Sequence, residues 1–405
     1  METEEQKDGF LGGIRVLDLA DEKASFCSKL LADMGAYVIK VEKPGGDSSR
    51  KFGPFYKNPS DTEISLSFFY NNTNKHGITL DLENAEGREI FAKLVKPTDI
   101  IVEAFPPGYL EGLGLGFEIL SEINRRLILV SVSGFGGNGP RRHYKTCDLV
   151  ASAFGGQMYV TGCPSVPPLK AFGEQAYYAA SLFAAIGALL AVRRRNQTEK
   201  GEHIDISIQE AVVSTLEHVM VQYFYDQTIP KRQGRLHRNN AFCILPCREG
   251  HILLTLSYQW ETFVELMESD GMAEDLMDEK WNDEEYRLQH LDHIMEVSQK
   301  WTRTHTVAEL FNLGQLMRFP WSPVQCPKEV LDSPQLKARG FFMGIDHPEI
   351  GAFFKYPGMP YKFSSSMSKQ SRRAPLIGEH NVRIYQEELG LVEKEMKRLS
   401  SEGII

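Results

Sequence analysis

Several features that would place this chain outside the ordinary globular class are missing from its 405 residues. The net charge is −9 and no basic run is longer than Arg193 to Arg195, which argues against nucleic-acid binding. The six cysteines are scattered and suggest no disulfide framework, as is typical of a reducing compartment. The amino-terminal METEEQKDGF lacks the basic start and apolar core of a signal peptide. These absences predict a cytoplasmic protein without a nucleic-acid partner.

Long apolar segments are also scarce. The longest apolar run, Ala179 to Val192, is shorter than the roughly 20 residues that a membrane-spanning helix needs. We therefore predict no membrane contact and interpret this run as a buried helix. A hydrophobic content of 42% and a charged content of 24% are typical of a globular protein, and the length favours two domains.

Strand-like and helix-like segments alternate along the first third of the chain. IRVLDLA from Ile14 is a short apolar run, helical spacing follows over Ser25 to Met34, and AYVIKVE is rich in β-branched residues. The alternation repeats through residues 78–135. Strands joined by helices pair in parallel, so the sequence predicts a doubly wound α/β domain with a parallel sheet. Ligands of such sheets bind at the carboxyl ends of the strands, where the loops PGG, FPPG and GFGGNGP follow.

A change of composition marks a second region. From about Met220 to Pro320 the sequence becomes charged and rich in aromatic residues, with HILLTLSYQW as its clearest strand. This region predicts a second, smaller α+β domain.

Motifs spread over nearly the whole chain resemble those of the family III CoA-transferases, the group that contains formyl-CoA and carnitine CoA-transferases. They include LLADMGAYVIKVEKPGGD, LDLENAEGREIFAKLV, SVSGFGGNGP, DLVASAFGGQMYVTG and APLIGEHN, in the family's order. The resemblance implies the family's fold, in which two subunits interlock like links of a chain. It also implies that the tail returns to the first domain, so that residues 1–219 and 329–405 form the large domain and residues 220–328 the small one.

The segment Gly173 to Gly187, GEQAYYAASLFAAIG, departs from that family at one position. Relatives read G-P-Q-A-D-Y or G-V-P-I-A-D-L here, and their aspartate attacks the acyl-CoA thioester. The aligned residue in this chain is Tyr177. A phenol forms only an aryl ester and has no carbonyl of its own to hold CoA. We therefore predict that this chain has no catalytic residue and that a homologous partner subunit supplies the aspartate.

Alternative hypotheses remain open. Glu174, three residues before Tyr177, would serve as the nucleophile of an active homodimer if the loop shifted. Asp148 starts the helix-like DLVASAF and is interpreted as an N-cap or a structural acid. Racemases of the same fold need an aspartate and a histidine, but this chain has Tyr177 and Cys147 at those positions. A regulatory or binding paralogue without transfer chemistry is the third hypothesis.

The resemblance also implies which residues contact the substrate, CoA or an acyl-CoA. Positions that hold CoA in relatives are occupied by Lys40, Asn74, Lys75 and Phe105. Two other contact segments differ from the family, because DEKAS replaces an R-V-x-A-G-P-type loop after the first strand and Gly112 replaces an arginine. Solvated surface lysines and a core phenylalanine are the alternative interpretations. No covalently bound cofactor is expected.

Two further features carry weaker signals. GFGGNGP offers backbone N–H groups in a glycine-rich turn, which would suit an anion. Cys243 and Cys247, with His237 and His251 nearby, match half of a zinc site, but a second pair at regular spacing is missing. We interpret the two cysteines as small core residues and expect no metal.

Within the family, the chain is most similar to the nucleophile-lacking subunit of a heteromeric succinyl-CoA:(R)-benzylsuccinate CoA-transferase, which acts in anaerobic toluene degradation. The resemblance implies a heterodimer with a homologous subunit. It implies succinyl-CoA as the CoA donor and (R)-benzylsuccinate as the candidate acceptor.

Overall fold

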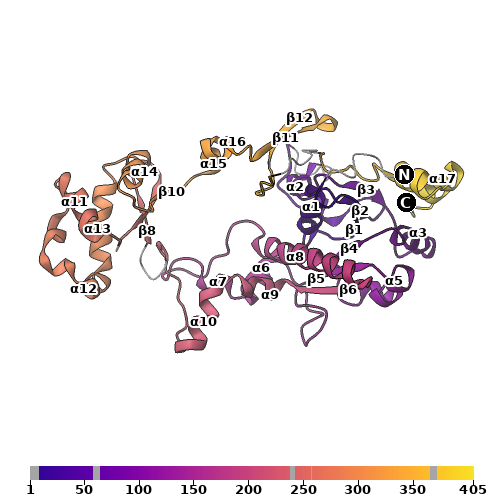
Figure 1. The fold of residues 1–405 in the computed structure, drawn as a ribbon, viewed down its shortest axis with the longest axis horizontal. Coiled ribbons are helices and arrows are strands. Elements are labelled where there is room, and N and C mark those ends of the chain that lie inside the picture. The colour runs from indigo at the N-terminus through magenta and orange to yellow at the C-terminus, as the bar shows by residue number, and fades with distance from the viewer. Residues whose placement is uncertain (1–8, 58–63, 238–241, 257, 365–371) are drawn as a thin grey trace. The chain divides into compact units, whose positions relative to one another are not determined.

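The computed structural model describes residues 9–57, 64–237, 242–256, 258–364 and 372–405, and they divide into two compact units. Unit 1 comprises the described residues up to Met158, Lys170–Thr228 and Gly340–Ile405. Unit 2 comprises the described residues of Tyr159–Leu169 and Ile229–Arg339. Figure 1 shows the elements of each unit.

Unit 1 is built on a six-stranded sheet in which every strand pair is parallel, in the order β3-β2-β1-β4-β5-β6. This confirms the predicted α/β fold class. The strand order reverses beside β1, between β1 and β4, and ligands of doubly wound sheets bind at such a point. The strands are β1 (Arg15–Asp18), β2 (Tyr37–Glu42), β3 (His76–Thr79), β4 (Ile100–Glu103), β5 (Ile128–Ser133) and β6 (Glu202–Ser207).

Helices cover both faces of this sheet, because successive strand residues point to opposite sides and both sets are apolar. Val16 lies in the cluster that also holds residues of α1 and α8, whereas Leu17 lies in the cluster with α3 and α17. The α-helices of unit 1 are α1 (Ser25–Asp33), α2 (Leu66–Asn71), α3 (Ala85–Val95), α4 (Tyr109–Gly112), α5 (Phe117–Ile123), α6 (Asp148–Phe154), α8 (Gln175–Thr198), α9 (Ile208–Ser214), α10 (Glu217–Asp226) and α17 (Glu393–Ser401). The short helix α7 (Gln157–Val160) contains residues of both units. The hairpin β11 (Phe342–His347) and β12 (Ala352–Pro357) adds a separate two-stranded sheet.

Helix α8 is longer than its apolar run suggests. It has 24 residues and is long and apolar enough to cross a membrane by length and composition alone, but half of its most apolar window is buried inside the protein. Ala180, Ala184 and Ala188 repeat at intervals of four and let the helix pack closely on the sheet. The opposite face exposes Leu182, Phe183, Ile186 and Leu190. The interpretation as a buried helix is therefore correct for one face and wrong for the other.

Unit 2 contains a four-stranded antiparallel sheet in the order β10-β9-β8-β7, covered by helices. Its core holds all four tryptophans of the chain together with Cys243 and Cys247, so these cysteines lie among core residues. The elements are β7 (Leu236–His237), β8 (Phe242–Pro246), β9 (His251–Thr255), β10 (Ser322–Pro323), α11 (Trp260–Ser269), α12 (Glu284–Gln289), α13 (Leu291–Thr302), α14 (Val307–Leu316), α15 (Pro327–Asp332) and α16 (Pro334–Ala338).

Candidate active site

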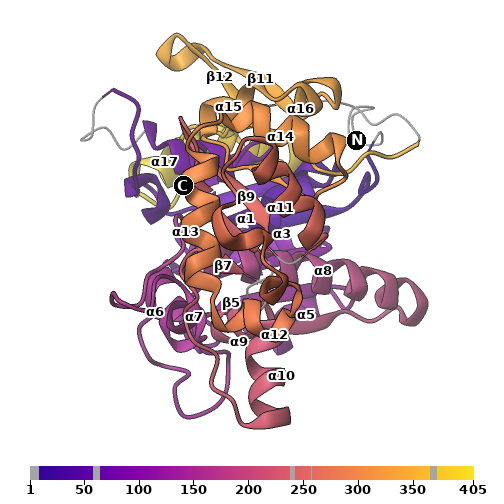
Figure 2. The ribbon, with the colours of Figure 1, turned by 90° about the vertical axis from the view of Figure 1, so that its left-hand side faces the viewer.

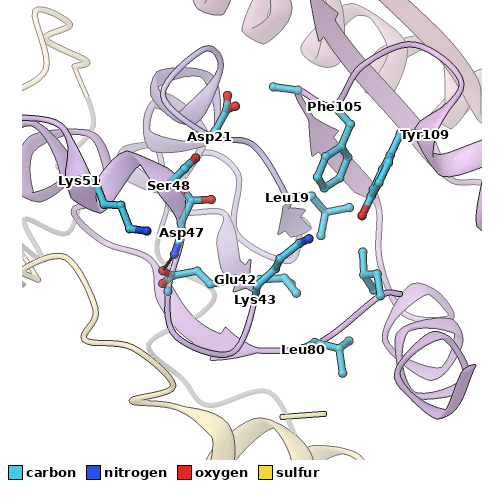
Figure 3. A pocket seen from close by; sticks show the side chains of 14 residues that line it. Leu19, Asp21, Glu42, Lys43, Asp47, Ser48, Lys51, Leu80, Phe105 and Tyr109 are labelled. Carbon is cyan, nitrogen blue, oxygen red and sulfur yellow. Dashed lines mark hydrogen bonds between the residues drawn. The ribbon is translucent and has the colours of Figure 1, made fainter. Parts of the chain in front are cut away.

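A cavity of about 390 Å³ opens at the carboxyl edge of the unit 1 sheet. Its wall is formed where strands end: Leu19 follows β1, Lys43 follows β2, Leu80 follows β3 and Phe105 lies just after β4. The full lining is Leu19, Asp21, Val41, Glu42, Lys43, Gly46, Asp47, Ser48, Lys51, Leu80, Leu82, Ala104, Phe105 and Tyr109 (Figure 3). The cavity therefore lies beside the reversal of strand order, the expected place for a ligand in this architecture.

Two aromatic rings form one wall of the cavity. The Phe105 and Tyr109 rings lie side by side, with centroids 4.6 Å apart (Figure 3). Gly108 adopts a φ of 92° directly before α4, a conformation that favours glycine, and this turn brings Tyr109 back beside Phe105. The Tyr109 hydroxyl donates a hydrogen bond to Glu83 at 3.0 Å. Phe105 therefore packs partly against the core and also lines the cavity.

Charged groups of both signs surround these rings. Lys43 lies 2.8 Å from Glu83, and the Lys43 ammonium is largely exposed. Lys51 also lines the cavity and forms no ion pair with any described residue. Asp21 and Asp47 lie on the same lining. The cavity thus offers an aromatic surface and two lysines to a ligand that has both a flat ring and negative charge.

Lys75 is completely buried below this edge of the sheet. Its ammonium donates hydrogen bonds to Asp18 at 2.8 Å, to the Ser25 carbonyl at 2.9 Å and to Asn72 at 2.8 Å. An ammonium has three N–H groups, so all of them are used inside the protein. Burial lowers the pKa of Lys75 to about 8, although Asp18 acts in the opposite direction. The interpretation of Lys75 as a solvated surface lysine is wrong.

Lys40 is buried as well, and the same correction applies to it. Its ammonium donates to the Ala20 carbonyl and lies 3.4 Å from Asp47. Burial acts to lower the pKa of Lys40, but nearby carboxylates, led by Asp47, outweigh it and hold the pKa above its ordinary value. Lys40 thereby attaches the loop after β1 to the loop after β2. Contact of either lysine with CoA stays a prediction.

Asn74 connects three parts of unit 1 and does not line the cavity. Its backbone has a left-handed φ of 63°, which asparagine tolerates better than most residues. Its side chain donates to Asp33 at 2.7 Å and accepts the Arg372 N–H at 2.8 Å. The structure therefore brings Phe105 to the cavity but places Asn74 elsewhere, and its predicted CoA contact remains a prediction.

Tyr177 lies in the first turn of α8, and only 5% of its surface is exposed. Its side chain belongs to the apolar cluster of the sheet face covered by α1 and α8. Burial raises the pKa of the Tyr177 hydroxyl, and the negative charges of Glu22 and Asp21 raise it further. The phenol is therefore protonated at neutral pH and is a poor nucleophile.

Asp148 holds the start of α8. Its Oδ1 accepts the N–H groups of Ala176 at 2.9 Å and Tyr177 at 3.2 Å, and its Oδ2 lies 2.7 Å from the Lys170 ammonium. A carboxylate at this place satisfies helix N–H groups that have no partner within the helix. Asp148 is thus the structural acid that the sequence suggests, but it caps α8, whereas the N-cap of its own helix is Cys147.

The acidic residues near Tyr177 differ in their surroundings. Glu174 is the N-cap residue of α8. Burial raises the pKa of its carboxyl group, and the nearby negative charge of Asp148 raises it further. Glu22, in the DEKAS loop, has a buried Oε2 atom without a hydrogen-bond partner in the described chain. Burial and then Asp21 raise the pKa of Glu22 to about 7. Sequence reasoning missed Glu22 as a neighbour of Tyr177; the available signal was the two adjacent acids in DEKAS.

Glu103, at the end of β4, positions the aromatic wall. It accepts the Phe105 N–H at 2.6 Å and a hydrogen bond from Ser131. Ser131 in turn lies 2.9 Å from His203 Nε2 on β6. Burial raises the pKa of Glu103 to about 7. The carboxyl group is therefore protonated in the folded protein over a pH range in which it is ionised in the unfolded chain.

Glu103→Gln is expected to change how stability depends on pH. The folded-state pKa of Glu103 exceeds the ordinary value of 4.5. The protonated Glu103 therefore makes its full contribution to the stability of the folded wild-type protein below pH 4.5, and this contribution is lost as the pH rises towards 7. The neutral amide keeps an acceptor for the Phe105 N–H. As the pH rises between these two values, the free energy of unfolding of the variant should increase by about 1 to 3 kcal/mol relative to that of the wild type. Urea unfolding at several pH values measures this, and parallel stability profiles of the two proteins would contradict it.

The glycine-rich turn GFGGNGP, a weak candidate for an anion cradle, contacts a carboxylate of the chain itself. The Gly137 N–H donates to Asp205 Oδ2 at 2.8 Å. The chain's own carboxylate therefore occupies the place of an anion, and a second negative charge there would be repelled. The turn alone could not show this contact, because Asp205 lies on β6, far along the sequence from Gly137.

Comparisons with known proteins agree with this architecture. A family model described as CoA-transferase family III matches residues 11–381. Subunit BbsE of succinyl-CoA:(R)-benzylsuccinate CoA-transferase from Thauera aromatica is 36% identical over 375 residues, covering 90% of this chain and 91% of that protein. The beta subunit of succinyl-CoA–L-malate CoA-transferase from Chloroflexus aurantiacus is 31% identical and covers 98% of each chain. The crystal structure of a CAIB/BAIF family protein from Brucella suis superposes with a TM-score of 0.85 at 29% identity, covering 94% of this chain and 99% of the other. The chain therefore belongs to the family III CoA-transferases.

Proposed function

We propose that this chain is the non-catalytic subunit of a heteromeric CoA-transferase and that a homologous partner subunit supplies the catalytic aspartate. The observation that carries the proposal is Tyr177, a buried and protonated phenol where the family's nucleophile is expected. The negative charges of Asp21 and Glu22 near it disfavour an anionic substrate at the same place. Two of the relatives are themselves named as subunits of their enzymes.

Exposed apolar surfaces of unit 1 support a partner subunit. The outer face of α8 exposes Leu182, Phe183, Ile186 and Leu190. Every residue of α10 is exposed except the half-buried Val219, and Figure 2 shows this helix projecting away from the sheet. Val221, Phe224 and Tyr225 of α10 are among the exposed apolar side chains. Apolar surface of this extent is typical of a protein interface. A homologous chain that interlocks with this one would cover it.

The cavity after β4 supports CoA as the ligand. An adenine ring would stack on Phe105 and Tyr109, and phosphate groups would approach Lys43 and Lys51. We infer from the names of the relatives that succinyl-CoA is the donor. For the acceptor we propose (R)-benzylsuccinate, a carboxylate that anaerobic toluene degradation converts into its CoA thioester.

Phe105→Ala is expected to weaken CoA binding by about tenfold to a hundredfold, because a base stacked on an aromatic side chain contributes roughly 1 to 3 kcal/mol. Isothermal titration of CoA into the purified complex measures the dissociation constant. The matched control is Phe353→Ala, since Phe353 is 60% exposed on β12 and does not line the cavity. Equal affinities of the Phe105 variant and wild type would place CoA outside this cavity.

The proposed function is tested by locating the enzyme-bound CoA thioester. A tagged form of this chain is purified from its natural source together with any partner. The complex, the partner and this chain alone are then incubated with succinyl-CoA and assayed for transfer. Peptide mass spectrometry should find CoA on an aspartate of the partner only. A thioester on Glu174 of the isolated chain would instead support the active homodimer, and a monodisperse chain without partner or transfer would support the regulatory paralogue.

A further inference from the structure

A second group of charged side chains lies at the opposite edge of the unit 1 sheet. His76 is the first residue of β3, so it lies at the amino edge, whereas the CoA cavity is formed after the strands end. His76 is 6% exposed. Arg372, Arg383 and His380, from the carboxyl-terminal part of unit 1, surround its ring. This group contributes nothing to the site described above.

Two guanidinium groups meet at one atom of His76. Arg372 donates a hydrogen bond to Nε2 of His76, and Arg383 donates to the same nitrogen at 3.4 Å. An imidazole nitrogen accepts only when it carries no proton, so His76 is neutral. Burial, followed by the charge of Arg372, lowers the pKa of His76 to about 2. The imidazole therefore cannot compensate either charge, and two cations lie side by side.

The neighbouring carboxylates have other partners. Glu388 pairs with Arg15 at 2.7 Å, and Glu379 pairs with Arg373 at 2.8 Å. Within the described ranges, no carboxylate forms an ion pair with Arg372 or Arg383. His380 accepts the Gly77 N–H through Nδ1 at 3.1 Å, so its other ring nitrogen carries the proton and is a donor. Among the described residues, the group thus has several N–H donors but no carboxylate that pairs with them.

We propose that His380, Arg372 and Arg383 form a binding site for a small oxyanion, phosphate or a dicarboxylate, separate from the CoA cavity. Guanidinium groups bind carboxylate and phosphate oxygens through paired hydrogen bonds. Both arginines are partly exposed, so an ion reaches them from solvent. An anion here would neutralise two adjacent positive charges that form no ion pair among the described residues, although the Arg383 guanidinium also lies 5.8 Å from the centre of the Tyr37 ring. The inference does not depend on which subunit carries the catalytic aspartate.

The site is tested by titrating the purified complex, or this chain if it is stable alone, with inorganic phosphate and separately with succinate. Chloride at about 0.15 M is present throughout, so that non-specific charge effects are screened. Arg372→Gln and Arg383→Gln each remove one guanidinium. Arg398→Gln is the matched control, because Arg398 is a surface arginine paired with Glu86 and Glu402. Calorimetry gives the dissociation constants, and thermal unfolding of wild type reports binding without any substitution.

Saturable binding of inorganic phosphate would identify the ligand as a phosphate, and saturable binding of succinate would identify it as a dicarboxylate. Each arginine variant should weaken that binding by about tenfold to a hundredfold, while the control stays near wild type. Saturating the CoA cavity with CoA should leave the affinity unchanged. The proposal is overturned if neither anion binds saturably or raises the unfolding temperature above the chloride reference, if CoA displaces the anion, or if the control loses as much affinity as the two variants.

Discussion

Tyr177→Asp is expected to leave the isolated chain without CoA-transferase activity and to lower its free energy of unfolding by about 3 kcal/mol or more. Tyr177 is 5% exposed and packs in an apolar cluster. Aspartate fills less of that volume and brings a carboxylate close to Asp21 and Glu22, which already raise the pKa of the tyrosine. Its own pKa would rise for the same reasons, so the restored side chain would be a poor nucleophile at neutral pH.

Tyr177→Phe is the control for this substitution. The tyrosine hydroxyl makes no hydrogen bond with the described part of the chain, so removing it should change the unfolding free energy by less than about 1 kcal/mol. Urea unfolding gives the stabilities, and mass spectrometry after incubation with succinyl-CoA detects any enzyme-bound CoA. An aspartate variant that is as stable as wild type and forms the thioester would show that the surroundings of Tyr177 remain a competent active site.

Lys75→Met should cost about 3 to 5 kcal/mol of stability, because removing one partner of a buried ion pair leaves the other charge uncompensated. Lys75 and Asp18 are both fully buried, and their ion pair spans 2.8 Å. Methionine keeps the length of the side chain and loses three hydrogen bonds, those to Asp18, Ser25 and Asn72. The loss should appear in unfolding experiments without CoA, because the ion pair exists in the chain itself.

Lys43→Met is the matched control, since Lys43 and Glu83 form a pair of similar length with both side chains more than half exposed. Such surface pairs contribute about 1 kcal/mol or less. The double variant Asp18→Asn with Lys75→Met removes both buried charges and should recover part of the loss. If Lys75→Met unfolds like wild type without CoA but binds CoA more weakly, Lys75 is a ligand contact and has no structural role.

Local patterns predicted the framework of unit 1 because parallel α/β units have a strong signature in sequence. The β-branched runs ending at Asp18 and Glu42, with a helix between them, form β1, α1 and β2 as expected. The strand β6 was not singled out, since EHIDIS alternates polar and apolar residues and lacks a run of adjacent apolar residues. The outer face of α8 was missed for a similar reason: an apolar run shows how hydrophobic a helix is, but not which side another chain covers.

Some features of the candidate site could also be predicted from the sequence, and others required the tertiary structure. The sequence by itself led to the prediction that Tyr177 stands where relatives carry their aspartate, and it showed that Phe105 follows a strand end, because both depend on position along the chain. Only the tertiary structure decided that Lys75 lies against Asp18, that Gly137 already binds Asp205, and that two arginines meet at His76. Each of these contacts joins residues far apart in sequence. Their burial and charge balance arise when strands and loops assemble, and no local spacing encodes them.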